Sequence, residues 1–152
     1  MLLLNPDDLK NITDQAEAAF PYEACGLLVG FQRVGGDVEV TRVAASKNMV
    51  AALHQDRFEI DPEMRLRVMR ELCHAAPATL PGAKRAIVGH YHSHPNGAPI
   101  PSATDLSMAW EPELIWLITA VVSGQAVQSM AYLLSESGTR FNDIGLGYLA
   151  SD

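Results

Sequence analysis

The chain is organised around the stretch Gly89-His90-Tyr91-His92-Ser93-His94-Pro95, which places three of the five histidines within five residues. It continues an apolar run, residues 86–89, that predicts a buried strand. Successive side chains of a strand project to opposite faces, so His92 and His94 share one face. Two imidazoles at that separation can bind one metal ion.

The residues after this strand offer a third ligand. Turn-forming residues end the strand, namely Pro95, Asn96, Gly97, Pro99 and Pro101. Ser102 then fits the N-cap of a short helix over 103–109, with Asp105 in its first turn. A loop that folds back brings the carboxylate of Asp105 to the two imidazoles. Two nitrogens, one oxygen and a free fourth position for water form the layout of a catalytic zinc site.

Two other interpretations of these residues stay open on spacing alone. Ser102 and Asp105 also match a capping box, in which serine and carboxylate only stabilise a helix N-terminus. His90 lies on the same strand face as His92 and His94. The spacing therefore also allows His90 and His92 as the ligand pair, or all three histidines together.

The polar positions resemble a known motif. His92-Ser93-His94-Pro95, six further residues, Ser102, two residues and Asp105 are similar to the JAMM motif of the MPN+ metalloprotease family. That resemblance implies that His92, His94 and Asp105 hold one zinc ion per chain. His90 falls where many members carry tryptophan, so we expect it to form a wall of the site.

The motif also has an upstream glutamate, which matches Glu23 within Pro21-Tyr22-Glu23-Ala24-Cys25-Gly26. Composition alone offers other candidates for a general base: Glu39, Glu59, Glu63, Glu71, Glu111 and Glu113. The resemblance selects Glu23 as the base that takes a proton from a metal-activated water. It implies that Ser102 steadies the developing oxyanion or the bound water. Residues 57–62 resemble the segment before the long helix of bacterial members.

The resemblance implies an α/β fold, with a central mixed β-sheet flanked by helices, as in MPN/JAB and cytidine-deaminase-like proteins. We expect one domain over residues 1–152. The implied function is zinc-dependent hydrolysis of a peptide or isopeptide bond after the Gly-Gly tail of a ubiquitin-like or sulfur-carrier protein. The alternative is a non-catalytic metal-binding protein or scaffold of the same fold.

Composition excludes several classes of function. Apolar residues make up 48% of the 152 and the net charge is -7, which favours a globular protein without a basic nucleic-acid footprint. No apolar run is long enough to span a bilayer, and the start lacks a signal-peptide pattern, so we expect a cytoplasmic protein. Cys25 and Cys73 are expected to be buried, reduced thiols. A homodimer is compatible with the sequence.

Periodicity and turn signals predict the remaining elements. A helix capped by Asn5 or Asp7 opens the chain and ends at Pro21. Further predictions are strands over 26–33, 38–45, 114–123 and 125–134, a helix from Asp61 to about His74, a linker over 76–83 and an ambiguous tail over 139–152. Trp110 and Trp116 are expected in the core, although Trp110 could also line a groove.

Overall fold

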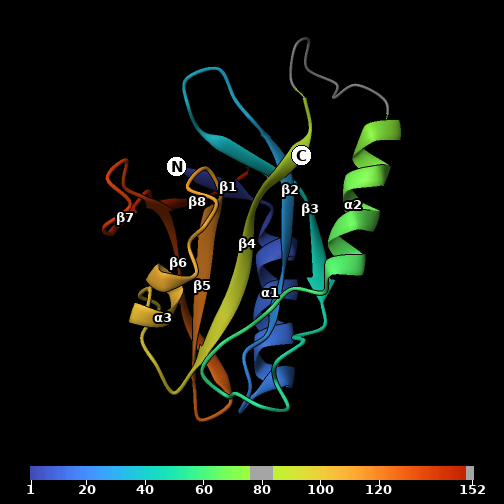
Figure 1. Ribbon diagram of the computed structural model, residues 1–152. Coiled ribbons are helices and arrows are strands. Elements are labelled where there is room, and N and C mark those ends of the chain that lie inside the picture. Colours follow the sequence, from blue (N-terminus) through green and yellow to red (C-terminus); the bar gives the residue numbers. More distant parts are fainter. Residues whose placement is uncertain (76–83, 150–152) are drawn as a thin grey trace.

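A computed structural model describes residues 1–75 and 84–149 of the chain, and its centre is one mixed sheet (Figure 1). The strands are β1 (Leu2–Leu4), β2 (Cys25–Gln32), β3 (Val38–Ser46), β4 (Ala86–Pro95), β5 (Ile115–Val122), β6 (Gln125–Leu134), β7 (Phe141–Asp143) and β8 (Leu146–Tyr148). Their order in the sheet is β7-β6-β5-β4-β2-β3-β1-β8. The predicted mixed sheet flanked by helices is confirmed.

Local turn chemistry explains the two long hairpins. Gly35 and Gly36, which join β2 to antiparallel β3, both have positive φ, a conformation that glycine adopts without steric cost. Ser123 and Gly124, which join β5 to antiparallel β6, also have positive φ. The central pair, β4 and β5, is parallel, so the chain between these strands must cross over the sheet. That crossover carries the loop and helix of the predicted site.

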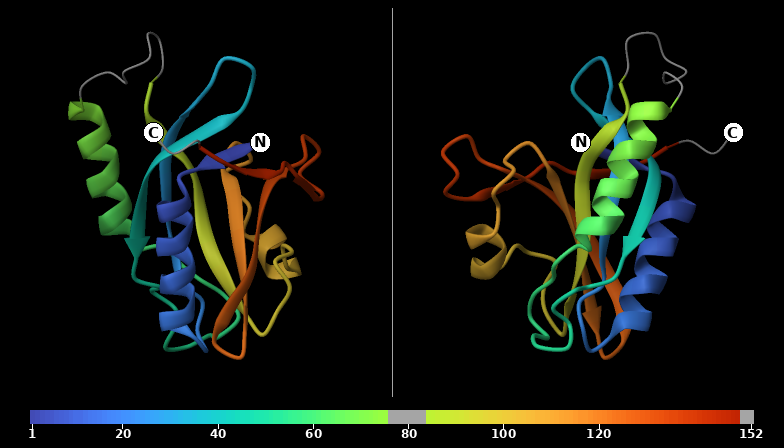
Figure 2. Two further views of the ribbon diagram at one scale, coloured as in Figure 1. Left: turned by 180° about the vertical axis from the view of Figure 1, so that it is seen from behind. Right: turned by 45° about the vertical axis from the view of Figure 1, so that its right-hand side comes forward.

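Two helices cover opposite faces of the sheet (Figure 2). Helix α1 (Pro6–Ala19), capped by Asn5, packs with Leu28 and other core residues on one face. Helix α2 (Pro62–His74), capped by Asp61, packs on the other face, against Leu27 and Val29 of β2. Because neighbouring side chains of β2 point to opposite faces, this single strand contributes to both cores.

Several predictions were wrong, and each concerns contacts between distant segments. The chain opens with strand β1, parallel to β3 and β8, and not with the helix. Cys25 is buried, but Cys73 is exposed on α2. Trp116 is buried, whereas Trp110 is 79% exposed and so lies outside the core.

The predicted linker over 76–83 lies outside the described residues. The tail, which the sequence left ambiguous between strand and helix, contains β7 and β8.

No helix in the described ranges combines the length and the apolar character that a membrane crossing requires.

Close packing between β4 and β5 leads to a test of the sheet. A Cβ atom added at Gly89 would overlap the carbonyl oxygen of Ile115 on the neighbouring strand. We expect Gly89→Ala to lower the free energy of unfolding by about 1–3 kcal/mol, the usual cost of overpacking. Urea denaturation measures this. The control Gln128→Ala, on the exposed side of β6, is expected to change stability by less than about 0.5 kcal/mol. Equal effects of both variants would contradict the close approach.

Candidate metal centre

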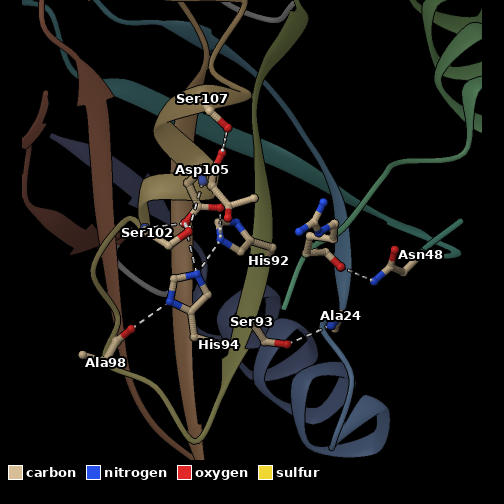
Figure 3. Close-up of polar contacts among 11 residues, drawn as sticks. Ala24, Asn48, His92, Ser93, His94, Ala98, Ser102, Asp105 and Ser107 are labelled. Atoms are coloured by element: carbon tan, nitrogen blue, oxygen red, sulfur yellow. Dashed lines mark hydrogen bonds and ion pairs between the residues drawn. The ribbon is translucent and has the colours of Figure 1, made fainter. Parts of the chain in front are cut away.

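Three side-chain ligand atoms converge at one end of β4 (Figure 3). The Nε2 atoms of His92 and His94 are 2.9 Å apart. Oδ1 of Asp105 lies 3.4 Å from Nε2 of His92, and Oδ2 of Asp105 lies 3.2 Å from Nε2 of His94. His92, His94 and Asp105 form the metal group, whose ligand atoms all lie within 4.8 Å of one another. The structure thus brings together the three residues that sequence analysis selected as ligands.

The loop after β4 holds the His94 ring in place. The backbone N–H of Asn96 donates to the carbonyl oxygen of Val121 at 2.6 Å, and this non-glycine residue has a φ of 53°. Nδ1 of His94 contacts the carbonyl oxygen of Ala98 at 2.9 Å, so it must carry the proton and donate. In the neutral ring Nε2 is then unprotonated and faces the other ligand atoms.

Asp105 is held by the helix α3 (Ala103–Ser107) in a complete capping box. The Ser102 hydroxyl accepts from the backbone N–H of Asp105 at 3.0 Å. The Ser102 backbone N–H and hydroxyl lie 2.6 and 2.8 Å from Oδ2 of Asp105. The capping interpretation is confirmed and is compatible with the metal interpretation, because the same box that begins the helix holds the carboxylate beside the histidines.

The buried donor set fits a divalent metal ion. His92 is 1% exposed and Asp105 is 5% exposed, so solvent cannot satisfy their facing lone pairs. Burial is the main reason that the pKa of His92 is lowered. Burial also acts to raise the pKa of Asp105, but the Nε2 atoms of His92 and His94, which donate to this carboxylate whenever they carry a proton, outweigh burial and hold that pKa well below its usual range. A neutral imidazole and an ionised carboxylate are the forms that bind metal.

His90 stands apart from the ligand group. It is 8% exposed, and its ring packs edge-on against Trp116 with centroids 4.2 Å apart. Its centroid is 6.2 Å from that of His92, and it is not part of the converging ligand group. Phe58 stacks on His92 at 4.4 Å and 18°. Among the three histidines, the geometry therefore favours His92 and His94 as the ligands and places His90 in an aromatic wall.

Glu23 is buried at the junction of α1 and β2, with 5% of its surface exposed. Burial is the largest cause of the rise in its pKa to about 8, and His94 opposes that rise. Glu23 lines a cavity of about 330 Å³ together with other site residues. The lining comprises Pro21, Glu23, Gln55, Asp56, His94, Pro95, Asn96, Gly97 and Ser102. Glu23 and Ser102, distant in sequence, thus face the same space as a histidine of the metal group.

Ser93, which the motif and its spacing did not single out, ties the Glu23 segment to the strand that carries His92 and His94. The hydroxyl of Ser93 accepts from the backbone N–H of Ala24 at 2.8 Å, and the Ser93 N–H donates to the Ala24 carbonyl oxygen at 3.0 Å. Ser93 lies between His92 and His94 but points to the opposite face. The sequence did contain a signal for Ser93. The alternation that aligns His92 and His94 turns Ser93 to the opposite face of a buried strand, where its hydroxyl needs a hydrogen-bond partner.

Cys25 is close to the site but is not part of it. Its Sγ lies 4.0 and 3.9 Å from the carbonyl oxygens of Ser46 and Lys47. Burial raises the pKa of the Cys25 thiol to about 12, so the thiol stays protonated at neutral pH. A protonated thiol is a poor metal ligand and nucleophile.

The raised pKa of Glu23 predicts how the stability of the metal-free protein depends on pH. Its ordinary pKa is 4.5 and its folded pKa is about 8, so ionisation destabilises the folded state. The stability of wild type relative to Glu23→Gln should be greatest below pH 4.5. It should fall as pH rises toward 8, by at most about 1.4 kcal/mol per unit.

Urea denaturation in a chelator between pH 4.5 and 8 measures this difference. The exposed control Glu59→Gln is expected to follow the wild-type curve. Parallel curves for Glu23→Gln and wild type would contradict the burial of an ionisable Glu23.

Comparison with known proteins places this architecture in a family. The family model described as prokaryotic homologs of the JAB domain matches residues 6–134. A desampylase from Haloferax volcanii is 34% identical over 98 residues, which are 64% of this chain and 62% of the desampylase. The chain thus spans less than two thirds of the length of that curated relative.

Solved structures agree with the family match. A solution structure from Desulfitobacterium hafniense has a TM-score of 0.79 and 26% identity, covering 99% of this chain and 94% of that one. A solution structure from Salinibacter ruber has a TM-score of 0.71 and 27% identity, covering 97% and 91%. A JAB1/MPN domain protein from Archaeoglobus fulgidus shares the fold, with a TM-score of 0.55, 15% identity and coverage of 99% and 98%. The chain therefore belongs to the prokaryotic homologs of the JAB domain, which confirms the resemblance to the JAMM/MPN+ family.

Proposed function

We propose that this chain is a zinc-dependent hydrolase that cleaves a peptide or isopeptide bond after the Gly-Gly tail of a ubiquitin-like or sulfur-carrier protein. The convergence of His92, His94 and Asp105, beside a cavity lined by Glu23 and Ser102, is the observation that carries this proposal. The similarity to a desampylase supports the class of substrate. One zinc ion per chain is expected.

His92, His94 and Asp105 would hold the zinc ion through two nitrogens and one oxygen. When bound, such an ion polarises the substrate carbonyl and lowers the pKa of water to about 7. The surrounding residues keep the ligands ready for this task. Nδ1 of His94 donates to the Ala98 carbonyl and Oδ2 of Asp105 accepts from the Ser102 backbone N–H, so neither ring nor carboxylate is free to turn away.

Glu23 acts in the proposal as the general base and then the general acid. Its carboxylate takes a proton from the attacking water and returns it to the leaving amine. A buried carboxyl with a pKa of about 8 can both accept and release a proton near neutral pH. Glu23 and His94 line the same cavity, and in the proposal water and substrate enter there.

Ser102, which carries a hydroxyl, also lines this cavity. In the proposal this hydroxyl donates to the oxyanion that develops on the substrate carbonyl. Its backbone N–H remains bonded to Asp105, so the carboxylate keeps one partner while the hydroxyl is engaged with substrate.

The role of Glu23 can be separated from metal binding. We expect Glu23→Gln to retain about one zinc per chain and to lose roughly 10²- to 10⁴-fold in rate, the usual contribution of a general base. Intact-mass analysis follows cleavage of a Gly-Gly carrier fusion, and metal analysis measures zinc. The control Glu59→Gln should cleave like wild type. A chelator should stop cleavage and added zinc should restore it, whereas cleavage that survives metal removal would refute the proposal. A non-catalytic metal-binding protein would show zinc without cleavage in wild type.

The hydroxyl of Ser102 is tested in the same assay. We expect Ser102→Ala to lower kcat by about 10²- to 10³-fold, as for the loss of one oxyanion donor. Zinc content should stay near one per chain, because the three ligands remain. Ser107→Ala removes a hydroxyl from the same short helix and is expected to leave kcat unchanged. A Ser102→Ala enzyme with wild-type kcat would exclude this hydroxyl from the reaction.

A further inference from the structure

Asn48, labelled in Figure 3, lies in the loop after β3, and the hydrogen-bonding groups of its side-chain amide are all occupied. Its Nδ2 donates to the carbonyl oxygens of Glu23 at 3.0 Å and Arg57 at 3.1 Å. Its Oδ1 accepts from the backbone N–H groups of Val50 at 3.2 Å and Glu59 at 3.1 Å. These partners come from three stretches of the chain, around Glu23, Val50 and Phe58. One side chain therefore links the Glu23 segment to the Phe58 segment, which is distant in sequence.

Two of these bonds enclose Phe58. The Arg57 carbonyl belongs to the peptide group before Phe58, and the Glu59 N–H belongs to the peptide group after it. Both peptide planes that set the direction of the Phe58 side chain are therefore bonded to Asn48. The ring of Phe58 lies flat on His92, with centroids 4.4 Å apart and planes at 18°. Asn48 is therefore connected to His92 through one stacked ring.

The third bond reaches the proposed general base. The Glu23 carbonyl lies in the peptide group between Glu23 and Ala24, and the N–H of that same group donates to Ser93. This peptide plane is therefore bonded on one edge to Asn48 and on the other to the residue between His92 and His94. The direction in which the Glu23 side chain leaves the backbone depends on both bonds.

We propose that Asn48 is a positioning residue that sets the Glu23 side chain and the His92 ring relative to one another. It touches neither the cavity nor the ligand atoms, and its effect passes through the Glu23 peptide and the Phe58 ring. The kinetic part of this inference rests on the proposed function, while the part that concerns metal affinity does not. Residues that orient ligands in this way typically contribute about 10- to 100-fold in affinity or activity.

Only an asparagine amide meets all four requirements at this distance from the backbone. Two carbonyls need donors and two N–H groups need an acceptor, and the side-chain amide provides both. Aspartate has the same shape and keeps the acceptor, but it turns an oxygen toward two carbonyl oxygens. Asn48→Asp therefore tests the two donor bonds with little change in volume. Asn142→Asp, at an exposed position of β7, makes the same chemical change as a matched control.

The experiment compares these two variants in three measurements: the Kd for zinc by competition with a chromophoric chelator, kcat and KM on a Gly-Gly carrier fusion, and the visible spectrum of the cobalt-substituted protein. For Asn48→Asp we expect kcat to fall about 10- to 100-fold and the zinc Kd to rise about tenfold. KM should stay within about threefold and the cobalt spectrum should change, because geometry and not substrate binding is disturbed. Asn142→Asp should match wild type.

A folded Asn48→Asp with the kcat, Kd and cobalt spectrum of Asn142→Asp would overturn the inference and leave Asn48 a purely structural residue. If wild type does not cleave the carrier, the proposed function fails, and the zinc Kd and cobalt spectrum still decide the role of Asn48.

Phe58→Leu provides a second test should Asn48→Asp not fold, since it keeps all four Asn48 bonds and removes only the stacked ring. We expect its zinc Kd to rise about tenfold, as for other groups that orient a ligand. An unchanged Kd would overturn the route through Phe58.

Discussion

The alternation of side chains along β4 is the constraint on which the rest of the site depends. His92 and His94 point to the face covered by α2 and α3, while Ser93 between them points to the α1 face and binds the Ala24 backbone. One strand therefore aligns two imidazoles and anchors the segment that carries Glu23. A shift of β4 by one residue would exchange these faces, so the registers with β2 and β5 are as important as the ligands themselves.

The site concentrates polar groups that burial leaves without partners. Four buried side-chain atoms in the described ranges lack a hydrogen bond, and three of them belong to Glu23, His90 and His92. A buried polar atom without a hydrogen bond lowers the stability of the fold wherever it occurs. The clustering of three such atoms is typical of a functional site. In the proposed reaction water would pair with Oε2 of Glu23, whereas Nδ1 of His92 lies on the ring edge away from the Nε2 atom that would bind the metal. The apolar contacts of α1 and α2 on the two faces of the sheet offset the stability that these unpaired polar atoms cost the fold.

Much of the fold could be predicted because local signals were strong. Pro62 after Asp61 defined the start of α2, and the turn at Ser123-Gly124 defined the hairpin of β5 and β6. Strand β1 carried no such signal, because three apolar residues become a strand only when β3 and β8 lie beside them. The same reason explains Cys73, whose place on the exposed side of α2 depends on which helix face meets the sheet.

By itself the sequence determined which residue types were available to the site and at what spacing: two histidines one residue apart on a strand, a capped carboxylate after a proline-rich loop, and a glutamate before the first long strand. Chain packing, and not spacing, sets His90 apart from the ligand group, brings Glu23 to the cavity that His94 lines, and joins Glu23 to the Phe58 segment through Asn48. The physical reason is that hydrogen bonds and ring contacts between distant segments depend on chain packing, which leaves no periodic trace in the residues that make them.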